Sequence, residues 1–406
     1  MSESGQIRLG RAVADITPPL GLSLTGPSMK AETGNERIAR WVHQPLECRV
    51  LYLRDGDRTA VIVTLDLQGM SSKVARDIRL RIQRELEIPA WAVMISCSHT
   101  HSVPSLPKTG PAGDHPLGAY MAALRTAIVR AVAQASGSPV PCRIGYGSGE
   151  CDLAVSRRAV DERGHVYWPA RADPRAPVDR SVGVLRFDRL DGMTEAILFS
   201  YGCHPSVSLQ GDWLGPDYVG QARRVVEQSF PSALAAFVIG NAGDVRTDYT
   251  RPDGRFRWEV PVSLVEEAGT RLGSAVAATA QRINTGESGP LRTGRAYQSV
   301  YTQDDAKVED AEFLAFRIGD AALVSSPAEV FCEIGLGVRE STTTPLIFAS
   351  ITNGYIGYIP TLHAYEQGGY EVDMSWRGFG LPAGLREDSP RKFRLGMLGA
   401  LADAKR

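Results

Sequence analysis

The chain has 406 residues, of which 43% are hydrophobic and 22% are charged, so it carries enough apolar mass for a sizeable core. Its 45 Lys and Arg side chains balance 46 Asp and Glu, and a net charge of −1 argues against a nucleic-acid-binding protein, which would be basic. No apolar run approaches the roughly 18 residues of a membrane span, and the N-terminal segment lacks the apolar stretch of a signal peptide. The six Cys form no CxxC pair and are expected to be reduced. We therefore expect a cytoplasmic protein with no nucleic-acid partner and no integral membrane association.

Apolar, β-branched runs alternate with helical patterns along the whole chain. The expected elements are, in order, a hairpin of 48–53 and 59–67, a helix over 71–88, a strand over 91–98, a helix over 120–135, a hairpin of 182–187 and 195–201, a helix over 217–230, a strand over 235–239, a helix over 264–283, a hairpin of 313–318 and 321–325, and a strand over 346–351. Hairpins mixed with strand–helix units imply an α/β fold, with mixed β-sheets and packed helices.

No tandem repeat is evident in the sequence, and two segments are candidate linkers. Residues 169–177 are rich in Pro and Arg, and residues 284–291 are rich in Gly, Pro and Ser. Because the chemistry-bearing motifs fall on both sides of each segment, we interpret both as surface loops. The sequence therefore predicts a single domain over residues 1–406.

Chemistry-bearing side chains follow the predicted strands at the points where those strands end. Five apolar runs lead into His, Asp or Glu, and open α/β sheets place ligand sites at the carboxyl ends of their strands. We therefore expect these side chains to approach one another. In chain order they are Asp66, His99 with His101, His204, Asp244 and Glu329.

The segment His99-Thr-His101 is the sharpest local signal. Residues two apart on an extended chain face the same side, so two imidazoles can approach one ion, with a solvated or capping pair as the alternative. His204 alone is more typical of a turn before Pro, but these three are among only seven His in the chain. Glu329 would add a carboxylate oxygen, and mixed His and carboxylate ligation suits zinc while leaving room for a water.

Two other motifs narrow the chemistry. The stretch Gly240-Asn-Ala-Gly-Asp244 matches neither GxGxxG nor GxxxxGK[ST], so we interpret it as a tight turn that lets the backbone approach the site. GxSxG does not occur, so a serine of the α/β-hydrolase type is not supported.

Several short segments, in this order, resemble the catalytic domain of the neutral/alkaline non-lysosomal ceramidases. They span almost the whole chain and are Ala14-Asp-Ile-Thr-Pro-Pro19, Ser98-His-Thr-His-Ser102, Gly202-Cys-His-Pro-Ser206, Gly240-Asn-Ala-Gly-Asp-Val245, Pro327-Ala-Glu329, Asn353-Gly-Tyr-Ile-Gly-Tyr358 and Gly369-Tyr-Glu371. The resemblance implies a zinc-dependent hydrolase of an amide bond. The chain ends at Arg406, so we expect the C-terminal immunoglobulin-like domain of full ceramidases to be absent.

The resemblance also assigns metal ligands. One zinc ion per chain would be held by His99, His204, Glu329 and Tyr358. Tyr355 is a rival for the tyrosine position and otherwise a substrate contact, but the separation between Tyr358 and Tyr370 favours Tyr358. Packing in the core or at the rim of the site is the alternative for each tyrosine.

Catalytic roles follow from the same resemblance. His101 resembles a second histidine that faces the substrate, and Arg157 resembles an arginine near the scissile carbonyl, with Arg158 as its adjacent competitor. Zinc lowers the pKa of bound water to ~7, so hydroxide would attack the carbonyl carbon. Zinc with Arg157 or Tyr370 would stabilise the oxyanion, and His101 would protonate the leaving amine.

Two carboxylates are candidates for the layer behind the metal ligands. Asp66 and Asp244 are candidates for orienting the metal-binding imidazoles through their free ring nitrogens. For Asp244 we favour the alternative role, which is capping of the turn.

The chain departs from the family where Ser-Pro-Asn usually follows Gly-Asp-Val. Arg246-Thr-Asp248 stands there, which removes an acyl-enzyme route through that serine and leaves the metal route intact. A guanidinium pairs well with a carboxylate or phosphate, so Arg246 is a candidate substrate contact. Residues 250–258 add three arginines and two aromatics, with a solvated loop as the alternative.

We therefore expect a small, soluble N-acyl or amide substrate, with an anionic group as one option. The alternatives are a true ceramidase that hydrolyses N-acylsphingosine, a zinc esterase or lactonase, and a catalytically silent homologue that binds a ligand. Assembly into a homo-oligomer stays open.

Overall fold

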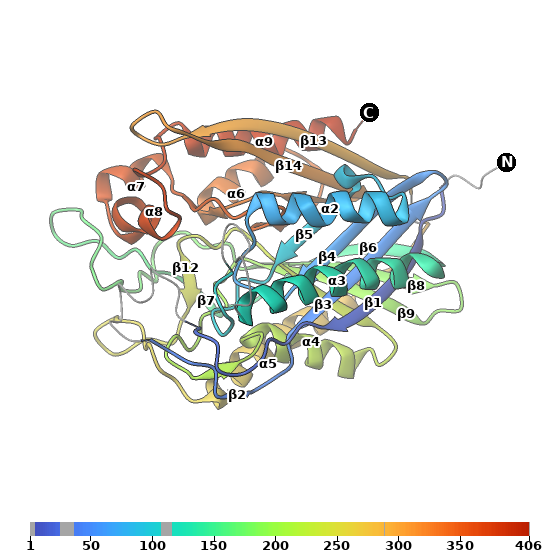
Figure 1. The fold of residues 1–406 in the computed structure, drawn as a ribbon, viewed down its shortest axis with the longest axis horizontal. Helices are drawn as coiled ribbons and strands as arrows, with labels where there is room; N and C mark the ends of the chain where they lie inside the picture. The colour runs from blue at the N-terminus through green and yellow to red at the C-terminus, as the bar shows by residue number, and fades with distance from the viewer. Residues whose placement is uncertain (1–4, 25–35, 107–115, 288, 406) are drawn as a thin grey trace.

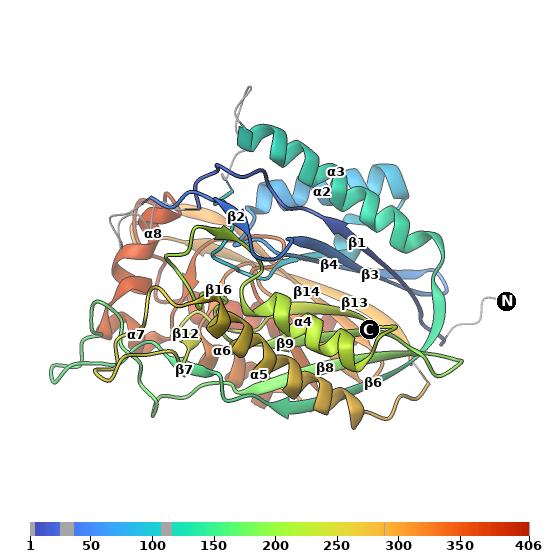
Figure 2. The same ribbon diagram turned by 90° about the horizontal axis from the view of Figure 1, so that it is seen from below.

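The computed structural model describes residues 5–24, 36–106, 116–287 and 289–405. Within these residues the strands form an eight-stranded sheet, a four-stranded sheet and two-stranded ribbons, with helices packed on the outer faces (Figures 1 and 2). Both large sheets mix parallel and antiparallel pairs, which confirms the predicted fold class. No helix in these ranges has the length and apolar character needed to span a membrane.

One pattern of strands and helices occurs three times along the chain. Each copy, here called a unit, has a first strand, an antiparallel hairpin, a helix, a strand parallel to the hairpin's second strand, and a last helix. The strand orders are β1-β3-β4-β5, β6-β8-β9-β11 and β13-β14-β15-β17, with the same sequence of antiparallel and parallel pairs in each. The helix between the last two strands of each unit supplies the crossover that a parallel pair requires.

The bounds of the elements follow this pattern. The first unit comprises β1 (Arg8–Asp15), β3 (Glu47–Asp55), β4 (Arg58–Leu65), α2 (Ser72–Leu86), β5 (Val93–Cys97) and α3 (Pro116–Gly137). The second comprises β6 (Val140–Glu150), β8 (Ser181–Arg189), β9 (Thr194–Tyr201), α4 (Tyr218–Ser229), β11 (Leu234–Ile239) and α5 (Val262–Gln281). The third comprises β13 (Leu291–Tyr301), β14 (Lys307–Ile318), β15 (Ala321–Ser325), α6 (Cys332–Glu340), β17 (Leu346–Ala349) and α9 (Ser389–Asp403).

Short elements fill the connections between the units and between their strands. They are β2 (Trp41–Val42), a 3₁₀ turn (Ala90–Ala92), β7 (Ala154–Ser156), β10 (Trp213–Leu214), β12 (Val245–Thr247), β16 (Glu329–Val330), β18 (Tyr358–Ile359), α7 (Leu362–Gln367), a π-helical turn (Tyr370–Met374) and α8 (Ser375–Gly378). Figure 1 shows β7, β12, α7 and α8 at the end of the molecule away from both chain termini.

The two large sheets enclose a central apolar core between them. The first two units join edge to edge where Leu9 of β1 pairs with Val140 of β6, which makes the eight-stranded sheet. Alternate residues of each strand then face either the central core or the outer helices. In β9, Leu198 packs in the central core with Leu314 of the third unit, whereas Phe199 packs in the cluster that includes the helices.

The sequence patterns missed the first strand of every unit. Half-exposed positions interrupt the alternation of apolar residues in β6 and β13, and Arg and Gly recur in all three strands. A short signal was nevertheless present, because the triplets Arg8-Leu-Gly10, Arg143-Ile-Gly145 and Arg292-Thr-Gly294 occur once in each first strand. The threefold repeat is therefore a repeat of topology that three-residue matches are too short to reveal.

Gly10 and Gly294 lie against the end of the last helix of their units, and Gly145 lies against Ile283 and Asn284, just after α5. A Cβ at Gly10 would stand 1.8 Å from the carbonyl oxygen of Ala135, and a Cβ at Gly294 would stand 2.3 Å from that of Ala400. The backbone of the strand approaches the backbone of the helix so closely that only glycine fits.

We predict that Gly294→Ala lowers the free energy of unfolding by about 2 kcal/mol, because the added methyl group overpacks the contact with α9. Urea denaturation measures this difference. Gly137→Ala is the matched control: nothing lies within 4 Å of its Cβ position, so the variant should stay within about 0.5 kcal/mol of the wild type. Equal stabilities of the two variants would contradict the close approach.

Candidate metal centre

The three units each deliver one side chain to the same place. His99 follows β5 of the first unit, His204 follows β9 of the second, and Glu329 follows β15 of the third. All three are at most 2% exposed. The sequence predicted that these strand ends meet, and the structure brings them together.

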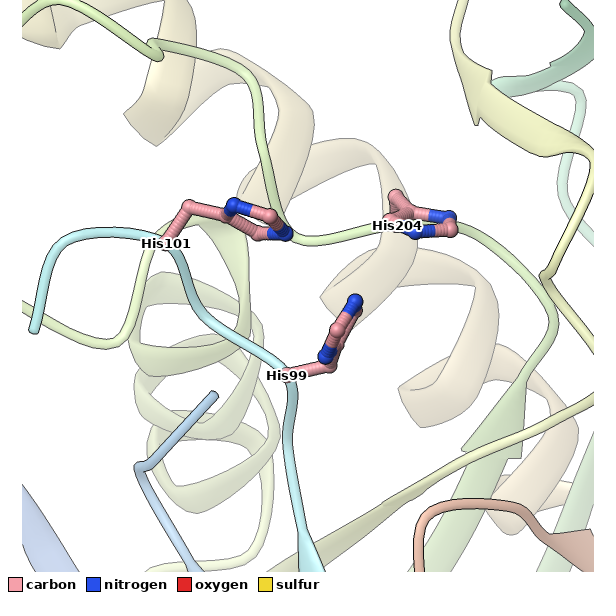
Figure 3. Close-up of side chains that lie close together, drawn as sticks. All are labelled: His99, His101 and His204. Carbon is pink, nitrogen blue, oxygen red and sulfur yellow. The ribbon is translucent and has the colours of Figure 1, made fainter. Parts of the chain in front are cut away.

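The three side chains converge on one oxygen atom. Nε2 of His204 lies 2.8 Å and Nε2 of His99 lies 3.2 Å from the same Oε2 of Glu329. His101 belongs to the same group, since one ring nitrogen from each of His99, His101 and His204 lies within 4.8 Å of the others (Figure 3). This buried cluster could hold a metal ion.

Backbone carbonyls fix the tautomers of the two histidines. Nδ1 of His99 donates to the carbonyl oxygen of Gln68 at 2.6 Å, and Nδ1 of His204 donates to that of Val245 at 3.0 Å. A carbonyl oxygen only accepts, so each Nδ1 carries a proton and each ring turns its Nε2 toward Glu329.

The chemistry of this donor set fits a cation. Burial, aided by Arg157, lowers the pKa of His204 to about 4, so its ring is neutral at pH 7. Two nitrogen lone pairs and a carboxylate oxygen that face one point repel one another unless a positive charge lies between them. The described residues therefore fit a metal ion.

Asp66 and Asp244 were candidates for orienting the imidazoles, but in the described residues both bind other partners. Asp66 accepts two hydrogen bonds from Arg223, at 2.9 and 2.6 Å, and Asp244 accepts one from the backbone N–H of Cys332 at 2.8 Å. Asp244 thus caps the start of α6, whereas the favoured alternative was capping of its own turn. The backbone carbonyls of Gln68 and Val245 orient the two imidazoles instead.

Backbone conformation at the cluster is unusual for the residue types present. His99 has φ = 70° and Asn353 has φ = 58°, in a region that residues other than Gly rarely adopt. The side chain of Asn353 accepts from the N–H of Ile95 at 2.9 Å and donates to the carbonyl of Val93 at 3.1 Å, which ties the loop after β17 to β5. Such strained residues concentrate at functional sites, where the surrounding structure holds them in place.

Both candidate tyrosines lie at Glu329. The hydroxyl of Tyr355 donates to Oε1 of Glu329 at 2.7 Å, and its ring centroid lies 5.6 Å from that of His99. Tyr358 pairs with Glu329 between β18 and β16. Burial, followed by the charge of Glu329, raises the pKa of both phenols well above its usual value. The structure thus places Tyr355, as well as Tyr358, beside the cluster of His99, His204 and Glu329.

Arg157 stands beside the cluster and is held by a carboxylate that the sequence analysis did not single out. Its Nε lies 2.7 Å from Oε1 of Glu371, and one of its NH2 groups donates to the carbonyl of Gly243 at 2.8 Å. Arg158 binds the other oxygen of Glu371. Burial raises the pKa of Glu371, but the two arginines outweigh burial and keep that pKa below its usual range. Glu371 ends the motif Gly369-Tyr-Glu371, which was the available signal.

An aromatic row leads outward from the cluster. Arg157 lies 5.3 Å from the ring centroid of Tyr358 and 6.0 Å from that of Tyr370. Trp168 stacks on Tyr370 at 5.8 Å with an interplanar angle of 16°, and it is 46% exposed. Arg157 and Tyr370, both predicted at the reaction centre, therefore lie on the same side of the cluster.

Arg246 is buried within the protein. Its guanidinium donates to the carbonyl of Ser206 at 2.8 Å and lies 4.8 Å from the ring of Phe256 and 5.4 Å from that of Trp258. The arginines of residues 250–258 are exposed, as expected of a solvated loop, but Phe256 is buried against Arg246. The role of Arg246 as a substrate contact stays a prediction.

No protein-family model matches the sequence, and no curated protein matches it. Two solved structures superimpose on this chain over most of its length. The neutral ceramidase from Pseudomonas aeruginosa superimposes with a TM-score of 0.77 at 19% identity, over 98% of this chain and 75% of that one. A ceramidase complexed with C2 gives 0.75 at 18% identity, with the same coverage. The chain therefore has the fold of the neutral ceramidase structures, which confirms the fold that the motifs implied.

We predict that Glu371→Gln lowers the free energy of unfolding by about 3 kcal/mol, because it leaves Arg157 and Arg158 buried without their carboxylate. Glu85→Gln is the control. It removes an exposed ion pair with Arg81 on α2 and should cost less than about 0.5 kcal/mol in the same urea titration. A loss no larger than that of the control would show that the buried pair is not stabilising.

Asp217 provides a pH-dependent prediction. Its carboxylate accepts from the N–H groups of Val207 and Tyr218, which secures the loop after His204, and burial raises its pKa from 3.8 to about 7. Because the folded-state pKa exceeds the unfolded one, the stability that this group contributes is present below pH 4 and is lost as the pH rises through 7. The free energy of unfolding then falls by at most about 1.4 kcal/mol per pH unit.

Asp217→Asn cannot ionise, so the difference in free energy of unfolding between this variant and the wild type should shrink between pH 5 and pH 8. Urea denaturation at both values measures this; a constant deficit would contradict it.

Proposed function

We propose that this chain is a zinc-dependent hydrolase that cleaves the amide bond of a small-molecule substrate. The observation that carries the proposal is the convergence of two imidazole nitrogens on one oxygen of Glu329. The fold supports it, because the two matched structures are ceramidases by name. The motif resemblance points to the same bond.

The donor set favours zinc among the metals. His99, His204 and Glu329 offer nitrogen and carboxylate oxygen, and Tyr358 or Tyr355 would add a phenol oxygen. Three or four such ligands with one open position are typical of catalytic zinc. A zinc ion bound there would supply a Lewis acid and activate a water molecule at neutral pH.

Arg157 and Tyr370 would stabilise negative charge on the carbonyl oxygen. The guanidinium stays protonated at every working pH, and Glu371 holds it in a fixed orientation, so it needs little reorganisation when the charge develops. Tyr370 lies within 6.0 Å of the same guanidinium and would offer a hydroxyl donor.

His101 would protonate the leaving nitrogen. Burial, followed by the neighbouring His99 and His204, lowers its pKa well below 6.5, so the ring is neutral at pH 7 and can donate only through the nitrogen that keeps a proton. An ester has a better leaving group and needs this proton less. His101→Ala should therefore reduce amide hydrolysis more than ester hydrolysis.

The proposal is tested by metal analysis together with a substrate panel. The purified protein should hold about one zinc per chain and hydrolyse at least one N-acyl amine or N-acyl amino acid, and a chelator should abolish the activity. His99→Ala, His204→Ala and Glu329→Ala should each lose the metal and reduce turnover by about 10²-fold or more.

His363→Ala is the control, since the side chain of His363 is 55% exposed and lies outside the cluster; it should keep both metal and activity. A protein that binds no zinc and cleaves no member of the panel would contradict the proposal and favour a silent ligand-binding homologue. Turnover of ceramide alone would contradict the small-substrate part and favour a ceramidase.

A further inference from the structure

Gln68 occupies the place in the first unit that His204 and Glu329 occupy in the other two. It stands three residues after the end of β4, as His204 stands three residues after β9, and Glu329 stands four residues after β15. The topology of the three units therefore delivers Gln68 to the same cluster. No motif of the sequence marked this residue.

Gln68 contacts two of the three clustered histidines. Its backbone carbonyl accepts from Nδ1 of His99 at 2.6 Å, and its side-chain Nε2 lies 3.5 Å from Nδ1 of His101. Its Oε1 accepts a hydrogen bond from the hydroxyl of Ser105 at 2.9 Å. The two ends of the amide thus have different partners.

This arrangement fixes the proton of His101. Ser105 donates to Oε1, so the NH2 group of Gln68 faces His101 and donates to Nδ1 of that ring. An imidazole whose Nδ1 accepts a hydrogen bond carries its proton on Nε2. His101 is thus the reverse of His99 and His204, whose protons lie on Nδ1.

The free face of His101 points to a proton donor and not to a third metal ligand. Within the described part of the chain its Nε2 is buried and has no hydrogen-bond partner. Oε2 of Glu329 lies within 3.2 Å of Nε2 in both His99 and His204, and these two rings suffice to define the point where a cation would sit.

We propose that Gln68 is a positioning residue that holds His101 in the tautomer with its proton on Nε2, ready for the leaving nitrogen of the amide. The chemistry of this step rests on the proposed function. As water adds to the carbonyl carbon and the C–N bond breaks, the bonding electron pair stays on nitrogen. The Nε2 proton passes to that nitrogen, and a proton of the added water replaces it on Nε2.

The opposite orientation of the Gln68 amide makes the opposite prediction. In that arrangement Oε1 would accept from Nδ1 of His101, the Nε2 lone pair would face the cluster, and His101 would become a third imidazole ligand. The ¹⁵N NMR spectrum of protein with labelled histidines distinguishes the two orientations of the amide, because protonated and unprotonated ring nitrogens have different chemical shifts.

The experiment compares wild type with Gln68→Leu and Gln68→Glu, with the His101 signals identified by their loss in His101→Gln. Wild type should show a protonated Nε2 and an unprotonated Nδ1. A carboxylate at position 68 can only accept, so Gln68→Glu should place a proton on Nδ1. Gln68→Leu should lose the single tautomer and reduce amide turnover by about 10- to 100-fold, with a smaller effect on an ester that has a good leaving group.

Gln83→Glu is the matched control. Gln83 lies on α2, where its Oε1 accepts from the N–H of Ala90, and a carboxylate there can still accept. It should leave the His101 signals and turnover unchanged. A proton on Nδ1 of His101 in the wild type, or identical signals in Gln68→Glu, would overturn the inference. The NMR readout needs no turnover, so expected tautomers without hydrolysis of any amide would overturn the proposed function instead.

Discussion

Two imidazole lone pairs and one carboxylate oxygen face a single point in the buried interior, and the surroundings of this point are arranged to keep them there. The carbonyls of Gln68 and Val245 hold the ring protons on the outer side of His99 and His204. Tyr355 holds the second oxygen of Glu329. A cation placed between the two ring nitrogens and the carboxylate oxygen would satisfy all three at once. The surrounding hydrogen bonds thus hold the donor atoms in the geometry that such an ion needs.

Much of this site could be predicted from the sequence, because strand ends carry a readable signal. An apolar run that ends in His or Glu predicts both the strand and the position of the side chain, so the pattern predicted that these strand ends meet, and the motif resemblance selected His99, His204 and Glu329 among them. The groups behind them could not be predicted. Backbone carbonyls have no sequence signature, so the candidates for binding the ring N–H groups were the carboxylates Asp66 and Asp244. These two bind Arg223 and the start of α6 instead. The half-exposed first strands β1, β6 and β13 were not predicted either, because Gly and Arg interrupt their alternation of apolar residues.

A second buried charged group, formed by Arg157, Arg158 and Glu371, lies next to the cluster. Arg157 and Arg158 bring two positive charges into the interior and Glu371 brings one negative charge, so this group leaves a net positive charge beside Glu329. That excess is suited to a reaction in which an oxygen becomes negative, because the compensating charge is present before the reaction begins. Arg246 has a different environment, because its guanidinium packs on the rings of Phe256 and Trp258.

The threefold pattern of units has a consequence for how the protein is made. His204 and Glu329 are separated by 125 residues, and each of the three convergent side chains belongs to a different unit. A nascent or proteolytically nicked chain that lacks one unit presents at most two of them, and two ligands retain an ion far more weakly than three held rigidly in place. The donor geometry therefore exists only in a chain whose three units are all docked around the shared core.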